Sequence, residues 1–354
     1  GFFDHPTFME ELMKLRYGIA FFLTLVLQNA WADAPIPTQE PLLLTQEPEQ
    51  YWQASLSGGP GKDGIPSIDR PRFQNADQTD LKDDDIVMGV YLDGQARAYP
   101  QNVLVWHEIV NDTIGDKNIA VTYCPLTGTG IGFVRGDTEL GVSGRLVNSN
   151  MLMYDRATDT YWPQIVATGV KGPLTGQGLQ EFRVVWTTWG RWLARHPQTE
   201  VLSQRTGFAR NYRRDPYGSY TPKGGYYAEQ SGVMFPLMNE NSRYPSKREI
   251  IGFRTATEAV AIDKQVLRDE QVMRYQGERQ DFLILYDHGL DSAWVLQGAQ
   301  DGLPDNLTLA DVDFGPAGPV GSRLTGLTPV NAIDAFWFAW YAFYPQTVVL
   351  DGKN

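Results

Sequence analysis

The sequence predicts a β-rich α+β protein whose two degenerate tandem halves pack into one globular unit. One observation is that short apolar segments alternate with glycine- and proline-containing turns, without the regular strand–helix alternation of a doubly wound sheet. The other is an internal echo, because Val87–Leu104 can be set over Ile250–Leu267 without a gap. With 354 residues, of which 42% are hydrophobic and 20% charged, the chain is long enough to bury such a core.

The first 32 residues have the layout of a leader. Met13–Arg16 is basic, Tyr17–Leu27 is apolar but too short to span a bilayer, and Ala30–Ala32 offers small residues for cleavage. We therefore expect residues 1–32 to be a mis-called start followed by a signal peptide that is cleaved near Ala32. The mature protein would then be periplasmic, with no stable membrane span. An uncleaved anchor is the alternative interpretation.

The first half covers residues 85–246 and follows a proline- and glycine-rich lead-in at residues 33–84. Ile86–Leu92 and Gln95–Tyr99 predict a β-hairpin, because the Asp93-Gly94 pair between them favours a type I′ turn.

Later elements of the first half are a strand and a helix. Ile119–Tyr123 is apolar and rich in β-branched residues, which predicts a buried strand ended by Cys124 and Pro125. Trp186–His196 has amphipathic spacing and predicts a helix that ends at Pro197.

The second half, residues 247–354, repeats the plan of the first. Trp189-x-x-Trp192 recurs as Trp337-x-x-Trp340, and the helix predicted there ends at Pro345. Two echoes in the same order favour an internal duplication. Chance similarity between hairpins is the alternative.

The register of the echo also locates the chemistry. It places Cys124 opposite Asp287 and His107 opposite Glu270, so the second half lacks both the thiol and the imidazole. Thiol and imidazole groups supply nucleophiles, bases and soft metal ligands. We therefore expect the functional site in the first half.

Charge and cysteine content limit the classes of function. A formal net charge of -12 argues against nucleic acid as a partner. Cys124 is the only cysteine, so the chain cannot form an internal disulfide. In an oxidising compartment an unpaired thiol is at risk of oxidation, which makes a functional role for Cys124 a serious hypothesis.

Cys124 and His107 allow two chemistries. In the first, they bind a transition metal, copper before zinc, with Met151 and His288 as further ligands. In the second, His107 activates Cys124 as the nucleophile of an enzyme that acts on a small exported substrate, and Asp112, Glu108 or Asn148 orients the imidazole. No CxxC, HExxH or GxSxG motif decides between them. A buried core cysteine and a hydrogen-bonded core histidine remain the structural alternative.

Residues 148–164 predict a binding surface. Their polar and aromatic side chains suit a pocket for a small-molecule ligand, which would make the chain a non-catalytic binding protein. An Asx-rich turn between strands fits the same composition. The candidate binding residues are Asn148, Asn150, Tyr154, Asp155, Trp162 and Gln164.

Four ordered motifs carry a resemblance to a known family. They are WHEIVND (106–112), TYCPLTGTGIGF (122–133), SGRLVNSNMLMYDRATDTYWPQ (143–164) and TTWGRWLARHPQTEVLS (187–203). With these motifs, the chain resembles the bacterial domain-of-unknown-function family 3179 from about Ile86 to the C-terminus. The resemblance implies an exported protein and brings no established activity. Members of that family often have a second cysteine three residues after the first. This chain has Thr127 there, which argues against a two-thiolate mechanism.

Overall fold

The computed structural model describes residues 35–352, so the leader predicted at residues 1–32 lies outside the described part of the chain. The protein is β-rich, with 40% strand and 13% helix, and its main sheets are arranged as the five blades of a β-propeller. The prediction of an α+β fold with two tandem halves is therefore wrong. No helix within residues 35–352 has the length and apolar character needed to cross a membrane.

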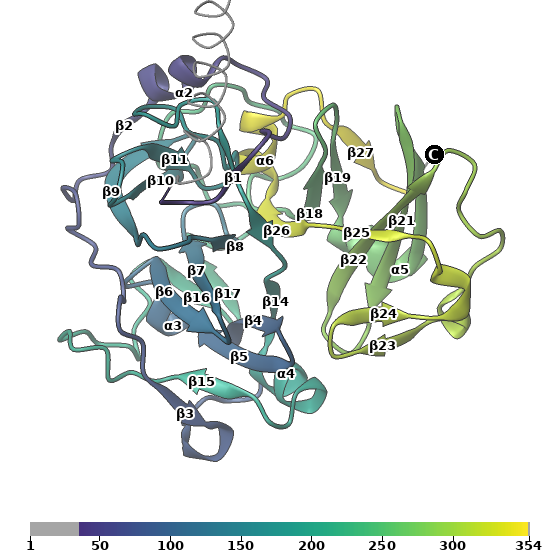
Figure 1. The fold of residues 1–354 in the computed structure, drawn as a ribbon, viewed down its shortest axis with the longest axis horizontal. Coiled ribbons are helices and arrows are strands. Elements are labelled where there is room, and N and C mark those ends of the chain that lie inside the picture. The colour runs from purple at the N-terminus through teal and green to yellow at the C-terminus, as the bar shows by residue number, and fades with distance from the viewer. Residues whose placement is uncertain (1–34, 353–354) are drawn as a thin grey trace, which may run out of the picture.

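Blades 1, 2 and 3 are built mainly from the first part of the chain and lie together on one side of the molecule (Figure 1). Blade 1 has the order β14-β4-β5-β15-β3, with β3 (Phe73–Asn75), β4 (Ile86–Leu92), β5 (Gln95–Pro100), β14 (Val185–Thr188) and β15 (Glu200–Leu202). Blade 2 has the order β13-β8-β7-β6, with β6 (Ile109–Ile114), β7 (Lys117–Cys124), β8 (Thr129–Val134) and β13 (Glu181–Phe182). Blade 3 has the order β11-β10-β9-β2, with β2 (Leu56–Ser57), β9 (Leu140–Val147), β10 (Asn150–Asp155) and β11 (Tyr161–Pro163).

Blades 4 and 5 come from the C-terminal part of the chain and lie on the other side in Figure 1. Blade 4 has the order β26-β18-β19-β27, with β18 (Glu249–Arg254), β19 (Ala259–Asp263), β26 (Ala332–Phe336) and β27 (Val348–Leu350). Blade 5 has the order β20-β21-β22-β25, with β20 (Val272–Gln276), β21 (Gln280–Asp287), β22 (Ser292–Ala299) and β25 (Thr328–Val330). Contacts of β8 with β26 and of β14 with β22 join the two groups of blades.

Short elements complete the described chain. The helices are α2 (Pro48–Ala54), α3 (Gln101–Leu104), α4 (Trp189–Arg195), α5 (Lys264–Glu270) and α6 (Trp337–Phe343). The 3-10 turns are η1 (Ala76–Gln78), η2 (Leu309–Asp311) and η3 (Ser322–Leu324). The remaining strand pairs are β1 (Thr38–Gln39) with β12 (Gly178–Leu179), β16 (Gly218–Tyr220) with β17 (Lys223–Gly225), and β23 (Asp313–Gly315) with β24 (Gly318–Val320).

The predicted hairpin at Ile86–Tyr99 is confirmed as β4 and β5, with Asp93 and Gly94 at positive φ in the turn. The helix predicted over Trp186–His196 begins only at Trp189. The residues before it belong to β14, which pairs antiparallel with β4, because β-branched and aromatic residues favour an extended backbone.

The two segments that echo each other in the sequence lie in blades of the same topology. In blade 1, β14 is antiparallel to β4 and β15 is parallel to β5. In blade 4, β26 is antiparallel to β18 and β27 is parallel to β19. Blade 4, the second blade with this topology, comes after blades 1, 2 and 3, and only blade 5 belongs with it to the C-terminal part of the chain. The five blades therefore do not divide into two equal halves.

Another hairpin of fixed register occurs three times, in blades 2, 3 and 5. The paired residues are Tyr123 with Gly130, Tyr154 with Tyr161, and Tyr286 with Ala293. Residues 300–352 contain no counterpart of the Tyr154 hairpin, so a division of the chain into two equivalent halves does not account for it.

Candidate functional site

Cys124 is the last residue of β7, and its side chain is 1% exposed. Its Sγ donates a weak hydrogen bond to the carbonyl oxygen of Ser149, at 3.7 Å. Burial, together with the negative charge of Glu108, raises the pKa of the thiol to about 11. At neutral pH Cys124 is therefore a protonated thiol inside the protein.

The position of Cys124 is equivalent to that of two aspartates. It follows Tyr123 in the repeated hairpin, as Asp155 and Asp287 follow the tyrosines of the other two. Asp155 and Asp287 each accept a hydrogen bond from a tryptophan Nε1 of their own hairpin, at 3.0 Å in both cases. Blade 2 thus has a thiol where blades 3 and 5 have a carboxylate with a structural role.

Glu108 lies close enough to Cys124 for the two charges to interact, and it is itself buried, with 6% exposure. The residue follows α3 and adopts a left-handed backbone conformation with φ of 60°, which is uncommon outside glycine and often found at functional sites. Its carboxylate accepts no hydrogen bond from any residue between 35 and 352, although its backbone groups are paired with Leu104 and Tyr123. Burial raises the pKa of this carboxyl to about 8.

A tyrosine-rich loop, residues 211–238, contributes two side chains to the same place. Tyr217 is partly buried, and its hydroxyl has no hydrogen-bond partner within the described chain. Burial and the charges of Glu108 and Cys124 raise the pKa of Tyr217, which places its phenol near both groups. The Tyr226 hydroxyl donates to the carbonyl oxygen of Leu126 at 2.7 Å, so it holds the loop against the turn that follows Cys124.

The β9–β10 turn forms the other side of the site. Its central residues Asn148 and Ser149 both have positive φ, as a two-residue type I′ turn requires. Asn148 Oδ1 accepts a hydrogen bond from the backbone N–H of Met238 at 2.7 Å. Its Nδ2 is buried without a hydrogen-bond acceptor in the described residues. We call Cys124, Glu108, Tyr217 and Asn148 the thiol site.

The chain was compared with models of known protein families. The family model described as "Protein of unknown function (DUF3179)" matches residues 62–347. The chain belongs to this family. The resemblance predicted from the four sequence motifs is thereby confirmed, and the thiol site of this family member lies inside the matched region. Neither the comparison with curated proteins nor that with solved structures found a match.

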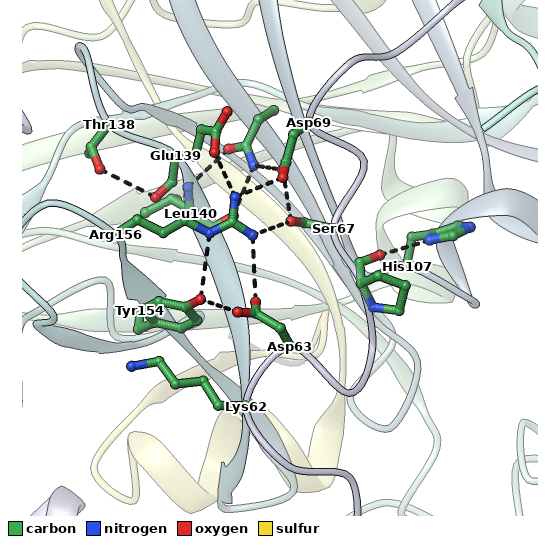
Figure 2. Close-up of polar contacts among 12 residues, drawn as sticks. Lys62, Asp63, Ser67, Asp69, His107, Thr138, Glu139, Leu140, Tyr154 and Arg156 are labelled. Atoms are coloured by element: carbon green, nitrogen blue, oxygen red, sulfur yellow. Dashed lines mark hydrogen bonds and ion pairs between the residues drawn. The ribbon is translucent and has the colours of Figure 1, made fainter. Parts of the chain in front are cut away.

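His107 of this DUF3179 protein is fully buried but does not hydrogen-bond to Cys124. Its Nδ1 donates to the carbonyl oxygen of Pro66 at 2.7 Å (Figure 2), and its Nε2 accepts from the Tyr212 hydroxyl at 2.7 Å. Burial lowers the pKa of His107, which agrees with a neutral ring in this tautomer. The ionisable group beside Cys124 is not His107 but its neighbour along the chain, Glu108.

The residues proposed as metal ligands are arranged as follows. Met151 lies in β10, with its backbone near the thiol of Cys124, whereas His288 is exposed beside Tyr286 and hydrogen-bonds to Gln271 at 3.1 Å. Residues 35–352 contain no group of three or more histidine, cysteine, aspartate or glutamate side chains that could hold a metal ion. A copper or zinc site stays a prediction from the sequence.

Two of the predicted binding residues, Asn150 and Gln164, are instead saturated with internal hydrogen bonds. Asn150 Nδ2 donates to Thr127 and Gln164, and its Oδ1 accepts from the backbone N–H of Ile165. Gln164 also donates to Thr122 and accepts from Thr129. This buried network ties blade 2 to blade 3.

Tyr154, Asp155 and Trp162 are also held by structural contacts. Trp162 Nε1 donates to Asp155, and the Tyr154 hydroxyl donates to Asp63 of the lead-in. Figure 2 shows Arg156 next to Tyr154, in contact with Asp63, Ser67, Asp69 and Glu139. The lead-in is therefore fastened to blade 3 by this cluster.

Sequence reasoning considered Glu108 only as a group that could orient His107, and it left out Tyr217. The available signal was the number of tyrosines between residues 212 and 227, which is high for a loop. Nothing in the sequence, however, placed that loop against β7.

Proposed function

We propose that this protein is a cysteine-nucleophile enzyme that transfers or hydrolyses the acyl group of a small exported ester, thioester or amide. Cys124 supplies the sulfur and Glu108 carries the proton. The observation that supports this most is the buried Glu108 carboxyl, which lies beside the only thiol of the chain and has no hydrogen-bond partner in the described structure. A buried ionisable group left unpaired is destabilising, and such groups concentrate where a protein needs their chemistry.

In the proposed reaction, Glu108 carries each proton between the thiol, the leaving group and water, so that no other acid or base is needed. The reaction starts from the ionised form of Glu108, which is the minor form at pH 7 because burial raises its pKa to about 8. This carboxylate accepts the proton of the Cys124 thiol, and the thiolate attacks the carbonyl carbon of the substrate. Glu108 then gives this proton to the departing alcohol, thiol or amine, which leaves an acyl thioester on Cys124. Water attacks the thioester, with Glu108 accepting its proton and returning it to the sulfur. The buried Nδ2 of Asn148 is a free donor on the adjoining turn, and it suits the oxyanion of the intermediate.

The proton transfer is feasible. The pKa of Cys124 is raised to about 11 and that of Glu108 to about 8. A difference of about 3 pKa units corresponds to about 4 kcal/mol, against a total barrier of about 16 kcal/mol for a turnover of about 10 per second. Because the thiol is buried, a substrate reaches it only when the side chains that cover Cys124 move.

The test uses p-nitrophenyl acetate and intact-protein mass spectrometry. At pH 7 we expect a burst of p-nitrophenol and one acetyl group on Cys124 of the wild-type protein, and no adduct on Cys124→Ser. Acetylation of Glu108→Gln should be at least about tenfold slower at this pH, because almost no thiolate forms there without Glu108 as the proton acceptor. Asp116→Asn, in the exposed β6–β7 turn, is the matched control and should react like the wild type. Absence of an adduct on Cys124, or equal rates for Glu108→Gln and wild type, would contradict the proposal.

We also infer a periplasmic location, since the layout of residues 13–32 is that of a signal peptide. Fractionation of cells that express the whole chain with a C-terminal tag should place the protein in the periplasm, cleaved near Ala32. Recovery of the uncleaved chain in the cytoplasm would refute this.

A further inference from the structure

A cavity of about 560 Å³ lies at blade 1, between residues 80–86 and the part of the tyrosine-rich loop at residues 212–221. Its volume is in the range of sites for small organic ligands. We propose that this cavity binds a small organic cation that carries an amine and further hydrogen-bond donors, in the class of amino sugars and polyamines. We call it the acidic cavity.

The first supporting observation is an acceptor without a donor. Gln101 lines the acidic cavity and is 7% exposed. Its Nε2 donates to the Asp215 carboxylate at 2.8 Å and to the Tyr123 hydroxyl at 3.1 Å, which fixes the orientation of the amide. No described residue donates to its Oε1. This oxygen is therefore free to accept a hydrogen bond from a ligand in the cavity.

The second observation is an excess of negative charge in the wall. The cavity is lined by four carboxylates and two cations, namely Asp80, Asp84, Asp85, Asp215, Lys82 and Arg213. The side chains of Asp80 and Asp84 make no ion pair or hydrogen bond with any residue in the described range. Lys82 and Arg213 are exposed and have no carboxylate partner in that range, so the carboxylates of the wall still outnumber its cations. The wall therefore favours a ligand with positive charge.

The wall is also rigid where it meets the core. Asp215 accepts hydrogen bonds from the Tyr227 hydroxyl and from the backbone N–H of Tyr217, both at 2.8 Å, in addition to the one from Gln101. The hydroxyls of Tyr123 and Tyr220 lie 3.3 Å apart in the same network. Acceptors that are held in place before binding lose little entropy when a ligand arrives.

The acidic cavity is distinct from the thiol site. Successive residues of a strand point to opposite faces of the sheet, so Tyr123 lies behind Gln101 of the cavity wall and Cys124 faces the β9–β10 turn of blade 3. The inference is therefore independent of the proposed acyl-transfer function, and Cys124→Ser should leave binding at the cavity unchanged.

The test is calorimetric titration of the folded mature chain with glucosamine, spermidine and glucose at low salt. We expect at least one of the two amines to bind about tenfold more tightly than glucose. Tighter binding of glucosamine would indicate a compact ligand, and tighter binding of spermidine would indicate an extended one. Equal binding of glucose, or no binding of either amine, would overturn the proposal.

Two variants locate the site. Asp80→Asn/Asp84→Asn removes exposed charges without disturbing the core and should weaken amine binding about tenfold. The matched control Asp116→Asn/Asp305→Asn removes the same charge from exposed positions elsewhere and should not change it. Equal affinity in both double variants would show that the amine binds outside the acidic cavity. Chemical-shift changes of the glutamine amide of Gln101 on titration provide a readout that does not depend on any substitution.

Discussion

Trp192 and Trp340 occupy the same place in blades 1 and 4, and each packs its ring against the backbone of a glycine in a neighbouring strand. Both indoles are fully buried. Trp192 Nε1 donates to Thr199 at 2.9 Å, and Trp340 Nε1 donates to Thr347 at 3.0 Å. Each tryptophan thereby fastens a helix and the strand after it to its blade.

The glycines under these rings are expected to tolerate no side chain. A Cβ on Gly89 would lie 2.2 Å from Trp192, and one on Gly252 would lie 2.4 Å from Trp340. We expect Gly89→Ala and Gly252→Ala each to lower the free energy of unfolding by about 1–3 kcal/mol through overpacking, as measured by urea denaturation. Gly61→Ala, where the added methyl meets nothing within 4 Å, is the control and should change stability little. Equal stability of all three variants would contradict the packing argument.

Glu108→Gln should make the thiol more acidic. The negative charge of Glu108 contributes to the raised pKa of Cys124, so its removal lowers that pKa and increases the thiolate fraction at a given pH. We expect faster alkylation of Glu108→Gln than of wild type by iodoacetamide at pH 9, measured by intact mass. Cys124→Ser provides the unlabelled baseline. Slower alkylation of Glu108→Gln would mean that Glu108 does not act on the thiol through its charge.

The raised pKa of Glu108 also predicts a pH dependence of stability. Its value is about 8 in the folded protein against 4.5 for an unperturbed glutamate, so between these values the folded state holds more protons than the unfolded state. The stabilising contribution of the protonated carboxyl is complete below about pH 4.5 and is lost as pH rises towards 8. We expect the wild type to lose several kcal/mol relative to Glu108→Gln between pH 5 and pH 8.5.

The quantity to measure is the difference in unfolding free energy between wild type and Glu108→Gln at each pH, because other groups also titrate in this range. Burial lowers the pKa of His196 to about 4, so its contribution is lost as pH falls through the range between 6.5 and 4. Both proteins share this term. Unfolding free energies that run parallel for wild type and Glu108→Gln from pH 5 to 8.5 would show that the carboxyl does not titrate in this range.

Gln164→Leu should destabilise the junction of blades 2 and 3. The substitution removes the amide that links Thr122, Thr129 and Asn150, and it leaves these buried polar groups with fewer partners. We expect a loss of about 2–4 kcal/mol in urea denaturation, with Gln95→Leu at the exposed end of β5 as the control. If Gln164→Leu lowers the free energy of unfolding no more than Gln95→Leu does, the network contributes nothing to stability.

The local elements were predictable from the sequence, but their number and assembly were not. The hairpin at Ile86 follows from the Asp-Gly turn, and the strand before Cys124 follows from its β-branched run. Blade 3 escaped the analysis because β2 comes from the proline-rich lead-in and pairs with β9, a contact between segments about ninety residues apart. Local patterns carry no information on such pairings.

The thiol site was predictable only in part, for a related reason. Cys124 was a candidate from the sequence because it is the only cysteine and ends a predicted buried strand. Glu108 became a candidate only when its burial was known, since an acidic residue next to a histidine is otherwise unremarkable. Asn150 and Gln164 looked available for a ligand because the sequence does not show that they bond to each other.

The exchange of an aspartate for Cys124 has a consequence for the turn that follows it. The turns after Asp155 and Asp287 are anchored by their own carboxylates, which accept from Thr158 and Leu290 backbone N–H groups. The turn after Cys124 borrows its anchors from elsewhere in the chain: the Tyr226 hydroxyl on Leu126, and the backbone N–H of Phe336 in blade 4, which donates to Thr127 at 3.0 Å. The hairpin of blade 2 is therefore held in place by its neighbours, whereas the hairpins of blades 3 and 5 anchor their own turns, and disturbing blade 4 or the tyrosine-rich loop should disturb the turn after Cys124 first.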